Sequence, residues 1–149
     1  MDREIEIIAE EMGTERDKLL PFMQEVLRCK NYLSEDSLRD IASAFQLSSA
    51  EVYGVASFYS FIETSPPGRH IIRLCKTVCC DLKNKDLILH TLERHLRIHL
   101  GETTADGKFS LLSTNCIGWC HESPAMMIND KIYTRLTPES TLKALEEWD

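Results

Sequence analysis

Five of the six cysteines fall in the second half of the chain, at spacings that metal sites use. Cys75 and Cys80 are separated by four residues, Cys79 directly precedes Cys80, and Cys116 and Cys120 are separated by three. In a reducing compartment such cysteines are metal ligands, redox thiols or core residues. Four thiolates hold either a 2Fe-2S cluster, with two ligands on each iron, or one structural zinc ion. Zinc sites more often use pairs separated by two residues, so the spacing favours iron–sulfur chemistry.

The surrounding elements must bring these two groups of thiols together. Apolar patterning and turn residues predict a strand over 69–75, a helix over 82–100 that Gly101 ends, and a second strand over 109–114. A strand, a helix and a strand in this order form a right-handed crossover whose strands are parallel and usually adjacent. Both cysteine groups then leave the sheet at the same edge, where open α/β sheets bind ligands.

The surroundings of the first thiol group suit a negatively charged centre. Four basic residues lie near it in the sequence: Arg73, Lys76, Lys83 and Lys85. The following helix, beginning near Asp81, is expected to point its N-terminal amides toward Cys80. A 2Fe-2S centre with four thiolates carries a charge of about −2, which nearby cations and amide donors stabilise. The lysines could equally form only a solvated face.

The rest of the second half completes a mixed α/β domain. A hairpin is predicted over 125–134 around a turn at 129–131, and a last helix begins with Thr137 as N-cap and Pro138 in its first position. The segment 65–68, Ser-Pro-Pro-Gly, cannot continue a helix and is predicted to be a linker. We therefore expect two domains, an acidic helical bundle over 1–64 and a second domain over 65–149.

The first 64 residues predict helices throughout. Apolar residues recur at threes and fours in four segments. Gly13 is expected to end the first segment, Thr14 to cap the second, and Ser34 and Ser48 or Ser49 to start the third and fourth. This half holds 13 acidic and 6 basic residues, whereas the second half holds 11 of each. The whole formal net charge of −7 therefore belongs to the predicted bundle.

Composition and charge exclude several classes of protein. With 43% hydrophobic and 28% charged residues, the chain has the make-up of a soluble globular protein rather than a disordered or fibrous one. No segment forms the basic face that nucleic acid requires, and none approaches the roughly 20 apolar residues of a membrane span. The N-terminus lacks the layout of a signal peptide. We expect a cytoplasmic protein without nucleic-acid binding or direct membrane insertion.

Several runs of residues resemble a known family. They are EVYGVASFY at 51–59, GETTADGKFSL at 101–111, CIGWC at 116–120, SP at 123–124, MIN at 127–129 and LTPE at 136–139. In this order they look like the thioredoxin-like 2Fe-2S ferredoxins of the complex I 24 kDa subunit type. The resemblance spans nearly the whole chain.

The resemblance implies a fold, a cofactor and partners. It implies an α+β protein in which an N-terminal helical bundle precedes a thioredoxin-like α/β domain, with one 2Fe-2S cluster on Cys75, Cys80, Cys116 and Cys120. Such subunits dock on a flavin- and NAD-binding iron–sulfur subunit in complex I, hydrogenases, formate dehydrogenases or electron-bifurcating complexes. FMN and NAD(H) are expected only on that partner, because this chain has no glycine-rich phosphate loop. The alternative is a zinc-stabilised adaptor without a redox role.

Two features near the thiols depart from the family pattern. Cys79 forms a vicinal pair with Cys80, and the four-residue spacing favours Cys80 as the ligand. Trp119 and His121 flank the last cysteine where the family tends to have small or apolar residues. His121 could replace a thiolate, as histidine does in Rieske centres, but with four cysteines available we expect it to lie outside the ligand set.

The remaining candidates have simpler interpretations. His90, His95 and His99 are expected to form a solvated helix face, and Cys29 to be a small buried hydrophobe. Core packing is the favoured role of the aromatic residues Phe58, Tyr59 and Phe61, and contact with a partner subunit is the second. A thioredoxin-type thiol catalyst is not favoured, because no two cysteines have the Cys-x-x-Cys spacing. We therefore expect no catalytic site in this chain.

Overall fold

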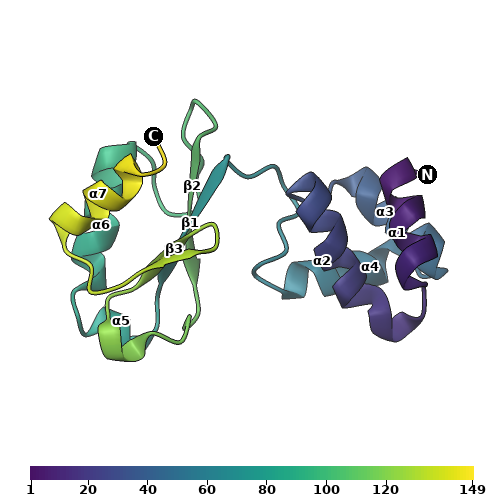
Figure 1. Ribbon diagram of the computed structural model, residues 1–149, viewed down its shortest axis with the longest axis horizontal. Coiled ribbons are helices and arrows are strands. Elements are labelled where there is room, and N and C mark those ends of the chain that lie inside the picture. The colour runs from purple at the N-terminus through teal and green to yellow at the C-terminus, as the bar shows by residue number, and fades with distance from the viewer. The chain divides into compact units, whose positions relative to one another are not determined.

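The computed structural model describes residues 1–149 and divides into two compact units, Met1–Pro66 and Pro67–Asp149 (Figure 1). The division falls between two consecutive prolines, which have no backbone N–H and cannot continue a helix. No helix in either unit combines the length and the apolar run that a membrane span needs.

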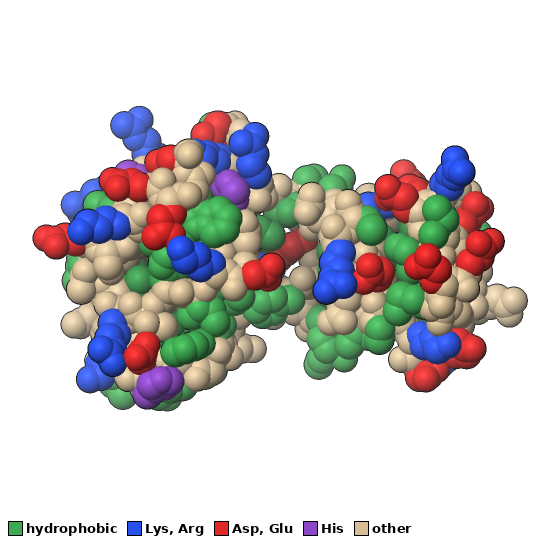
Figure 2. All heavy atoms as spheres, in the orientation of Figure 1, with side chains coloured by type: hydrophobic (Ala, Val, Ile, Leu, Met, Phe, Trp, Pro, Cys, Tyr) green, Lys and Arg blue, Asp and Glu red, His purple; other side chains and the backbone are tan.

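The first unit consists of helices, as predicted. They are α1 (Arg3–Met12), the short 3₁₀ helix η1 (Arg16–Lys18), α2 (Leu19–Lys30), α3 (Glu35–Phe45) and α4 (Ser49–Phe58). Each α-helix contributes apolar residues to one shared core, and Leu33 joins it from the loop between α2 and α3. The largest fully buried helix side chains in this core are Ile5, Phe22, Met23 and Ile41. Figure 2 shows acidic side chains spread over the visible face of this unit. The negative charge found in the sequence therefore lies on the bundle's solvated surface.

Side-chain caps fix where these helices begin. Ser34 accepts a hydrogen bond from the backbone N–H of Ser37, and Ser48 forms a capping box with Glu51. Both N-caps were predicted, and Gly13 ends α1 as expected. The prediction for Thr14 was wrong, because the next helical turn has Glu15 at its N-cap position.

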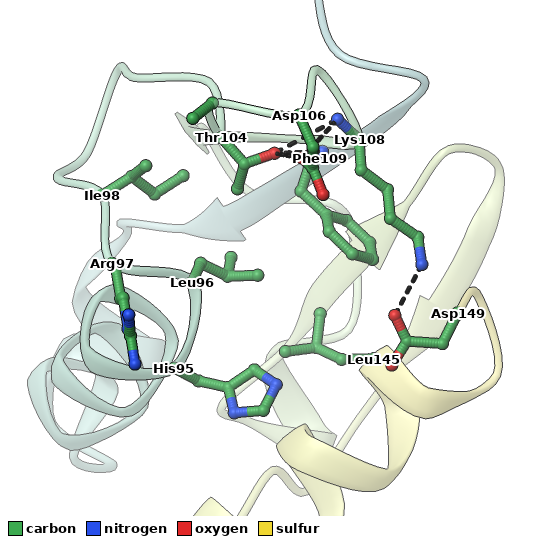
Figure 3. A pocket seen from close by; sticks show the side chains of 11 residues that line it. His95, Leu96, Arg97, Ile98, Thr104, Asp106, Lys108, Phe109, Leu145 and Asp149 are labelled. Carbon is green, nitrogen blue, oxygen red and sulfur yellow. Dashed lines mark hydrogen bonds and ion pairs between the residues drawn. The ribbon is translucent and has the colours of Figure 1, made fainter.

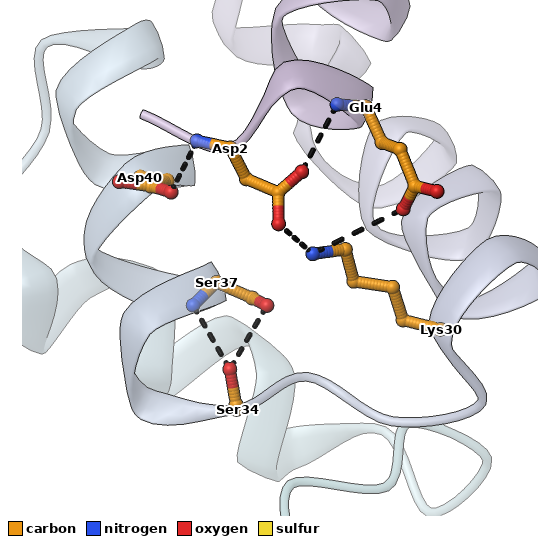
Figure 4. Close-up of polar contacts among 6 residues, drawn as sticks. All are labelled: Asp2, Glu4, Lys30, Ser34, Ser37 and Asp40. Carbon is orange, nitrogen blue, oxygen red and sulfur yellow. Dashed lines mark hydrogen bonds and ion pairs between the residues drawn. The ribbon is translucent and has the colours of Figure 1, made fainter.

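A polar cluster ties the chain's start to α2 and α3 (Figure 4). The backbone N–H of Asp2 donates to the Asp40 carboxylate at 2.8 Å, and the Asp2 carboxylate accepts from the backbone N–H of Glu4 at 3.0 Å and from the Lys30 ammonium. The hydrogen bond with Lys30 holds the pKa of Asp2 below its ordinary value, and the same bond raises the pKa of Lys30. The cluster serves the fold of the bundle.

The second unit is a four-stranded sheet with helices, which confirms the α+β class. Its elements are β1 (His70–Cys75), α5 (Val78–Asp81), α6 (Lys85–Leu96), β2 (Phe109–Thr114), the 3₁₀ turn η2 (Cys120–Glu122), β3 (Met126–Ile128), β4 (Lys131–Tyr133) and α7 (Pro138–Glu146). The strand order is β2-β1-β3-β4, with β1 and β2 parallel and the other neighbours antiparallel. In Figure 1, α6 and α7 lie together beside the sheet, and apolar residues of both helices share one core with the strands.

The crossover helix is shorter than the sequence predicted. Instead of one helix over 82–100, the structure has α5, a break, and α6. Asn84 and Arg97 have φ of 64° and 57°, and this left-handed conformation interrupts a right-handed helix at both places. Gly101 therefore lies beyond the helix rather than at its cap. The predicted helix start beside Cys80 was also wrong, because Cys80 lies inside α5.

Candidate metal centre

Two parallel strands deliver the cysteines to one edge of the sheet. Cys75 is the last residue of β1 and pairs in register with Thr114, the last residue of β2. Cys79 and Cys80 follow within α5, Cys116 lies two residues after β2, and Cys120 begins η2. As predicted from the sequence, β1 and β2 are parallel neighbours, and both cysteine groups follow them at one edge of the sheet.

The thiols are arranged in pairs. The Sγ atoms of Cys116 and Cys120 lie 3.1 Å apart, and the side chains of Cys75 and Cys80 are hydrogen-bonded to each other. The fifth thiol, Cys79, contacts the side chain of Cys120. No three His, Cys, Asp or Glu side chains of the chain converge closely enough to hold a single metal ion. A donor set of two pairs fits the two-ligands-per-iron pattern of a 2Fe-2S cluster.

The two pairs differ in burial. Cys75 and Cys80, here named the inner pair, are 1% and 2% exposed and pack against Ala125 and the partly buried Ile117. Cys116 and Cys120, named the outer pair, are exposed. One side of the site is therefore walled by the fold, and the other side faces solvent.

Hydrogen bonds surround the inner sulfurs. The Thr77 hydroxyl lies 3.0 Å from Cys75 Sγ, and the backbone N–H of Ile117 also donates to this sulfur. The Cys80 thiol donates to Ser123 Oγ at 3.7 Å, while the Ser123 hydroxyl donates to the backbone carbonyl of Cys120 at 2.7 Å.

The outer sulfurs have fewer such partners. The backbone N–H of Gly118 donates to Cys116 Sγ at 3.3 Å. The same Cys116 side chain also meets the Thr77 hydroxyl from the opposite loop. Amide and hydroxyl donors aimed at sulfur stabilise thiolate, the form in which cysteine binds metal.

Within each pair, one thiol ionises more readily than the other. Burial raises the pKa of Cys75, but hydrogen bonds, chiefly from Thr77, outweigh it, so the pKa lies below its ordinary value. Burial raises the pKa of Cys80. The hydrogen bond from Cys120 lowers the pKa of Cys116, and Cys116 and Cys79 together raise the pKa of Cys120 to about 12. Metal binding needs both thiols of each pair as thiolates, so it displaces the protons that they still carry.

The charges near the thiols are only partly those expected. Lys76 and Lys83 are exposed and make no ion pair, whereas Lys85 pairs with Asp81 and Asp86 at 3.3 and 3.1 Å. The positive charge available at this edge therefore comes from Lys76 and Lys83. Arg73 is buried within β1.

Trp119 and His121 stack beside the last cysteine. Their ring centroids are 5.5 Å apart and their planes meet at 25°. Both side chains are exposed, as are Val78 and Leu82 in and after α5. The solvent-facing edge of the site is therefore rich in apolar surface.

The other candidates from the sequence lie away from the thiols. His90 and His95 are exposed on α6, and His99 lies beyond its end. Cys29 is exposed, so its predicted burial was wrong. The next buried position of the α2 stripe after Val26 falls near Lys30, which pairs with Asp2.

The bundle aromatics are not core residues. Phe58 is 80% exposed at the end of α4, and Tyr59 and Phe61 after it are exposed as well. Their predicted core packing was wrong, because the buried positions of α4 are Val52 and Ala56 and the chain leaves the helix after Phe58.

A cavity in the second unit lies apart from the thiols (Figure 3). It measures about 420 Å³ between the end of α6, the start of β2 and the C-terminus, and the Lys108–Asp149 ion pair of 2.6 Å closes one side. Its lining contains no cysteine. We assign it no part in the site.

Comparisons with known proteins show the family of this chain. The family described as thioredoxin-like [2Fe-2S] ferredoxin matches residues 5–149. The E subunit of the NADH-quinone oxidoreductase of Buchnera aphidicola (strain Bp) is 34% identical over 97% of this chain and 85% of the relative. The corresponding protein of Escherichia coli K12 is 38% identical over 83% of this chain and 74% of its own length.

Two further relatives come from hydrogenases. The NADP-reducing hydrogenase subunit HndA of Solidesulfovibrio fructosivorans is 30% identical over 98% of this chain and 85% of its own length. A crystal structure of a NAD+-reducing [NiFe]-hydrogenase in its air-oxidised state aligns with a TM-score of 0.76 and 26% identity. That alignment covers 88% of this chain and 22% of the hydrogenase chain, so the fold corresponds to one part of that larger chain.

Proposed function

Because this chain belongs to the thioredoxin-like [2Fe-2S] ferredoxin family, we propose that it is the electron-transfer subunit of a NAD(P)H-linked oxidoreductase complex. In this role it exchanges single electrons with a flavoprotein subunit. The family resemblance found in the sequence is confirmed, and so is a 2Fe-2S cluster as the cofactor of this family. The observation that carries the proposal is the pairing of thiols at one edge of the sheet.

The proposed ligands are the inner and outer pairs. Cys75 and Cys80 would hold one iron, and Cys116 and Cys120 would hold the other. Cys79 remains a thiol, because only Cys80 shares the buried wall with Cys75. His121 stays outside the ligand set, since its ring stacks on Trp119.

The protein's own contribution is to hold and tune the centre. When bound, the cluster supplies one-electron chemistry. The inner pair excludes water on one side, because Ala125 and Ile117 cover its sulfurs. The N–H groups of Ile117 and Gly118 hold negative charge on sulfur. We propose no catalytic residue, because the sequence offers no nucleophile with a matching base and orienting residue.

The solvent-facing edge of the second unit suits a protein partner. Val78, Leu82 and Trp119 expose apolar surface around the ligand loops, and the unpaired Lys76 and Lys83 border it. Interfaces commonly combine an apolar centre with a polar rim. We propose that a flavin- and NAD-binding subunit docks here, because this chain has no glycine-rich phosphate loop of its own.

The larger assembly is proposed from the relatives. They belong to NADH-quinone oxidoreductase and to hydrogenases, so the complex is a complex I-like dehydrogenase, a hydrogenase, or a related formate dehydrogenase or bifurcating complex. A cytoplasmic location is proposed on the same ground.

Purification without oxygen tests the function. We expect a coloured protein with two irons per chain and, after dithionite reduction, an EPR signal from one 2Fe-2S cluster. A colourless chain with one zinc ion and no EPR signal would establish the zinc adaptor instead. Affinity purification of the tagged chain, followed by mass spectrometry, is expected to recover a flavoprotein subunit.

A further inference from the structure

Thr77 stands at a helix N-cap but does not cap the helix. Three other Ser or Thr residues at N-caps, Ser34, Ser48 and Thr137, each accept a hydrogen bond from a backbone N–H of their own helix. Thr77 precedes α5 in the same extended backbone conformation, yet its side chain makes no such bond. Its hydroxyl therefore does not make the capping hydrogen bond that Ser and Thr normally make at this position.

The hydroxyl is instead directed to sulfur. Thr77 Oγ1 lies 3.0 Å from Cys75 Sγ, and Cys75 is almost completely buried. Either atom can donate while Cys75 is a thiol. A metal-bound thiolate has no proton, so the Thr77 hydroxyl must then be the donor.

The other hydroxyl near the inner pair, that of Ser123, uses its proton in a hydrogen bond to the backbone. The Ser123 hydroxyl already donates to the backbone carbonyl of Cys120 at 2.7 Å, and its distance to Cys80 Sγ is 3.7 Å. A hydroxyl has one proton. The Thr77 hydroxyl contacts the sulfurs of Cys75 and Cys116, both proposed ligands, so its proton is available to a ligand sulfur, and its distance to Cys75 Sγ is 3.0 Å.

We propose that Thr77 is a positioning residue, and this proposal rests on the proposed function. Its hydroxyl donates to the Cys75 sulfur and thereby raises the reduction potential of the 2Fe-2S cluster. A hydrogen bond to a ligating sulfur offsets part of its negative charge. Reduction adds a further negative charge, so the bond stabilises the reduced form more than the oxidised form. Hydrogen bonds to sulfur are among the factors that set the potential of such clusters.

A matched pair of variants tests this role. Thr77→Val keeps the side-chain shape and removes the hydroxyl, whereas Thr77→Ser keeps the hydroxyl. In a redox titration followed by EPR, the potential of T77V is expected to shift to more negative values, and that of T77S to stay close to wild type. Thr91→Val is the control, because the Thr91 hydroxyl donates to the Leu87 carbonyl on α6. Its potential is expected to be unchanged.

The outcomes separate this inference from the proposed function. A wild-type chain that binds no iron–sulfur cluster overturns both. Clusters in all variants with the same potential in T77V and wild type overturn the role of Thr77 alone. If T77V assembles no cluster, Thr77→Ala replaces it, because alanine lacks the hydroxyl and adds no bulk. The potential of this variant is also expected to shift to more negative values. A T77S potential that follows T77V also contradicts the proposal, because the hydroxyl would not be the cause.

Discussion

The inner and outer thiol pairs are built from the same residue type, but the fold treats them differently. Cys75 and Cys80 come from the end of a central strand and a short helix, and they are buried against Ala125. Cys116 and Cys120 lie in a loop after an edge strand and are exposed. The inner pair is positioned by the core, whereas the outer pair is positioned by the local geometry of its loop. Substitutions around the inner pair should therefore affect core packing, whereas substitutions around the outer pair should affect only the loop.

The largest expected effect separates the two members of the vicinal pair. Cys80→Ser removes a proposed ligand from the inner wall, so cluster binding should weaken by more than the roughly 10–100-fold that changes outside the ligand set cost. Cys79→Ser should retain the cluster. Iron content and visible absorption of the two variants measure this. The opposite result would place Cys79 in the ligand set and Cys80 outside it.

The second effect concerns access to the metal-free thiols. In the reduced apo-protein, the exposed Cys116, whose pKa is lowered, should react with iodoacetamide much faster than the buried Cys75, by about tenfold or more, because a reactive cysteine must be both ionised and exposed. Cys29 is an internal standard, since it is an exposed cysteine outside the site. Mass spectrometry of peptides over a time course gives each rate. Equal rates at Cys75 and Cys116 would show that the inner wall does not protect its thiols.

The third effect is on the stability of the inner wall. Ala125 is 1% exposed and packs on the inner sulfurs, so Ala125→Val overfills that space and should lower the free energy of unfolding by about 1–3 kcal/mol. Urea unfolding of the apo-protein, followed by tryptophan fluorescence, measures it. Both tryptophans, Trp119 and Trp148, belong to the second unit, so the signal reports on that unit. An unchanged urea midpoint would show that the packing around Ala125 accommodates the larger side chain without loss of stability.

The sequence predicted the parts of this site that local signals encode. Alternating apolar residues place β1 and β2, and the handedness of crossovers then brings both cysteine groups to one edge. Ser34, Ser48 and Thr137 were recognised as caps because capping depends on neighbours in the chain. These elements agree between sequence and structure for that reason.

The sequence-based predictions failed where contacts between distant residues or unusual backbone conformations determine the local structure. The residues at the two ends of α6, Asn84 and Arg97, adopt left-handed conformations. Because neither residue is a glycine, the sequence did not signal these breaks. Cys29 was expected in the core, but the helix turns Lys30 toward Asp2, a partner 28 residues away in the chain. Thr77 would be taken for an ordinary cap, because its sulfur contact depends on how the strand end and the helix meet.

The smallest effect concerns the outer loop and sharpens the contrast with Ala125. Gly118 has φ of 89°, a left-handed conformation, and no atom lies within 4 Å of an added Cβ. Gly118→Ala should therefore cost only the backbone strain, about 1 kcal/mol, without a steric clash. Its backbone N–H still reaches Cys116, so cluster content should stay near wild type. The same urea titration compares the two variants. A larger loss of stability in G118A than in A125V would contradict the view that the core positions the inner pair and the loop alone positions the outer one.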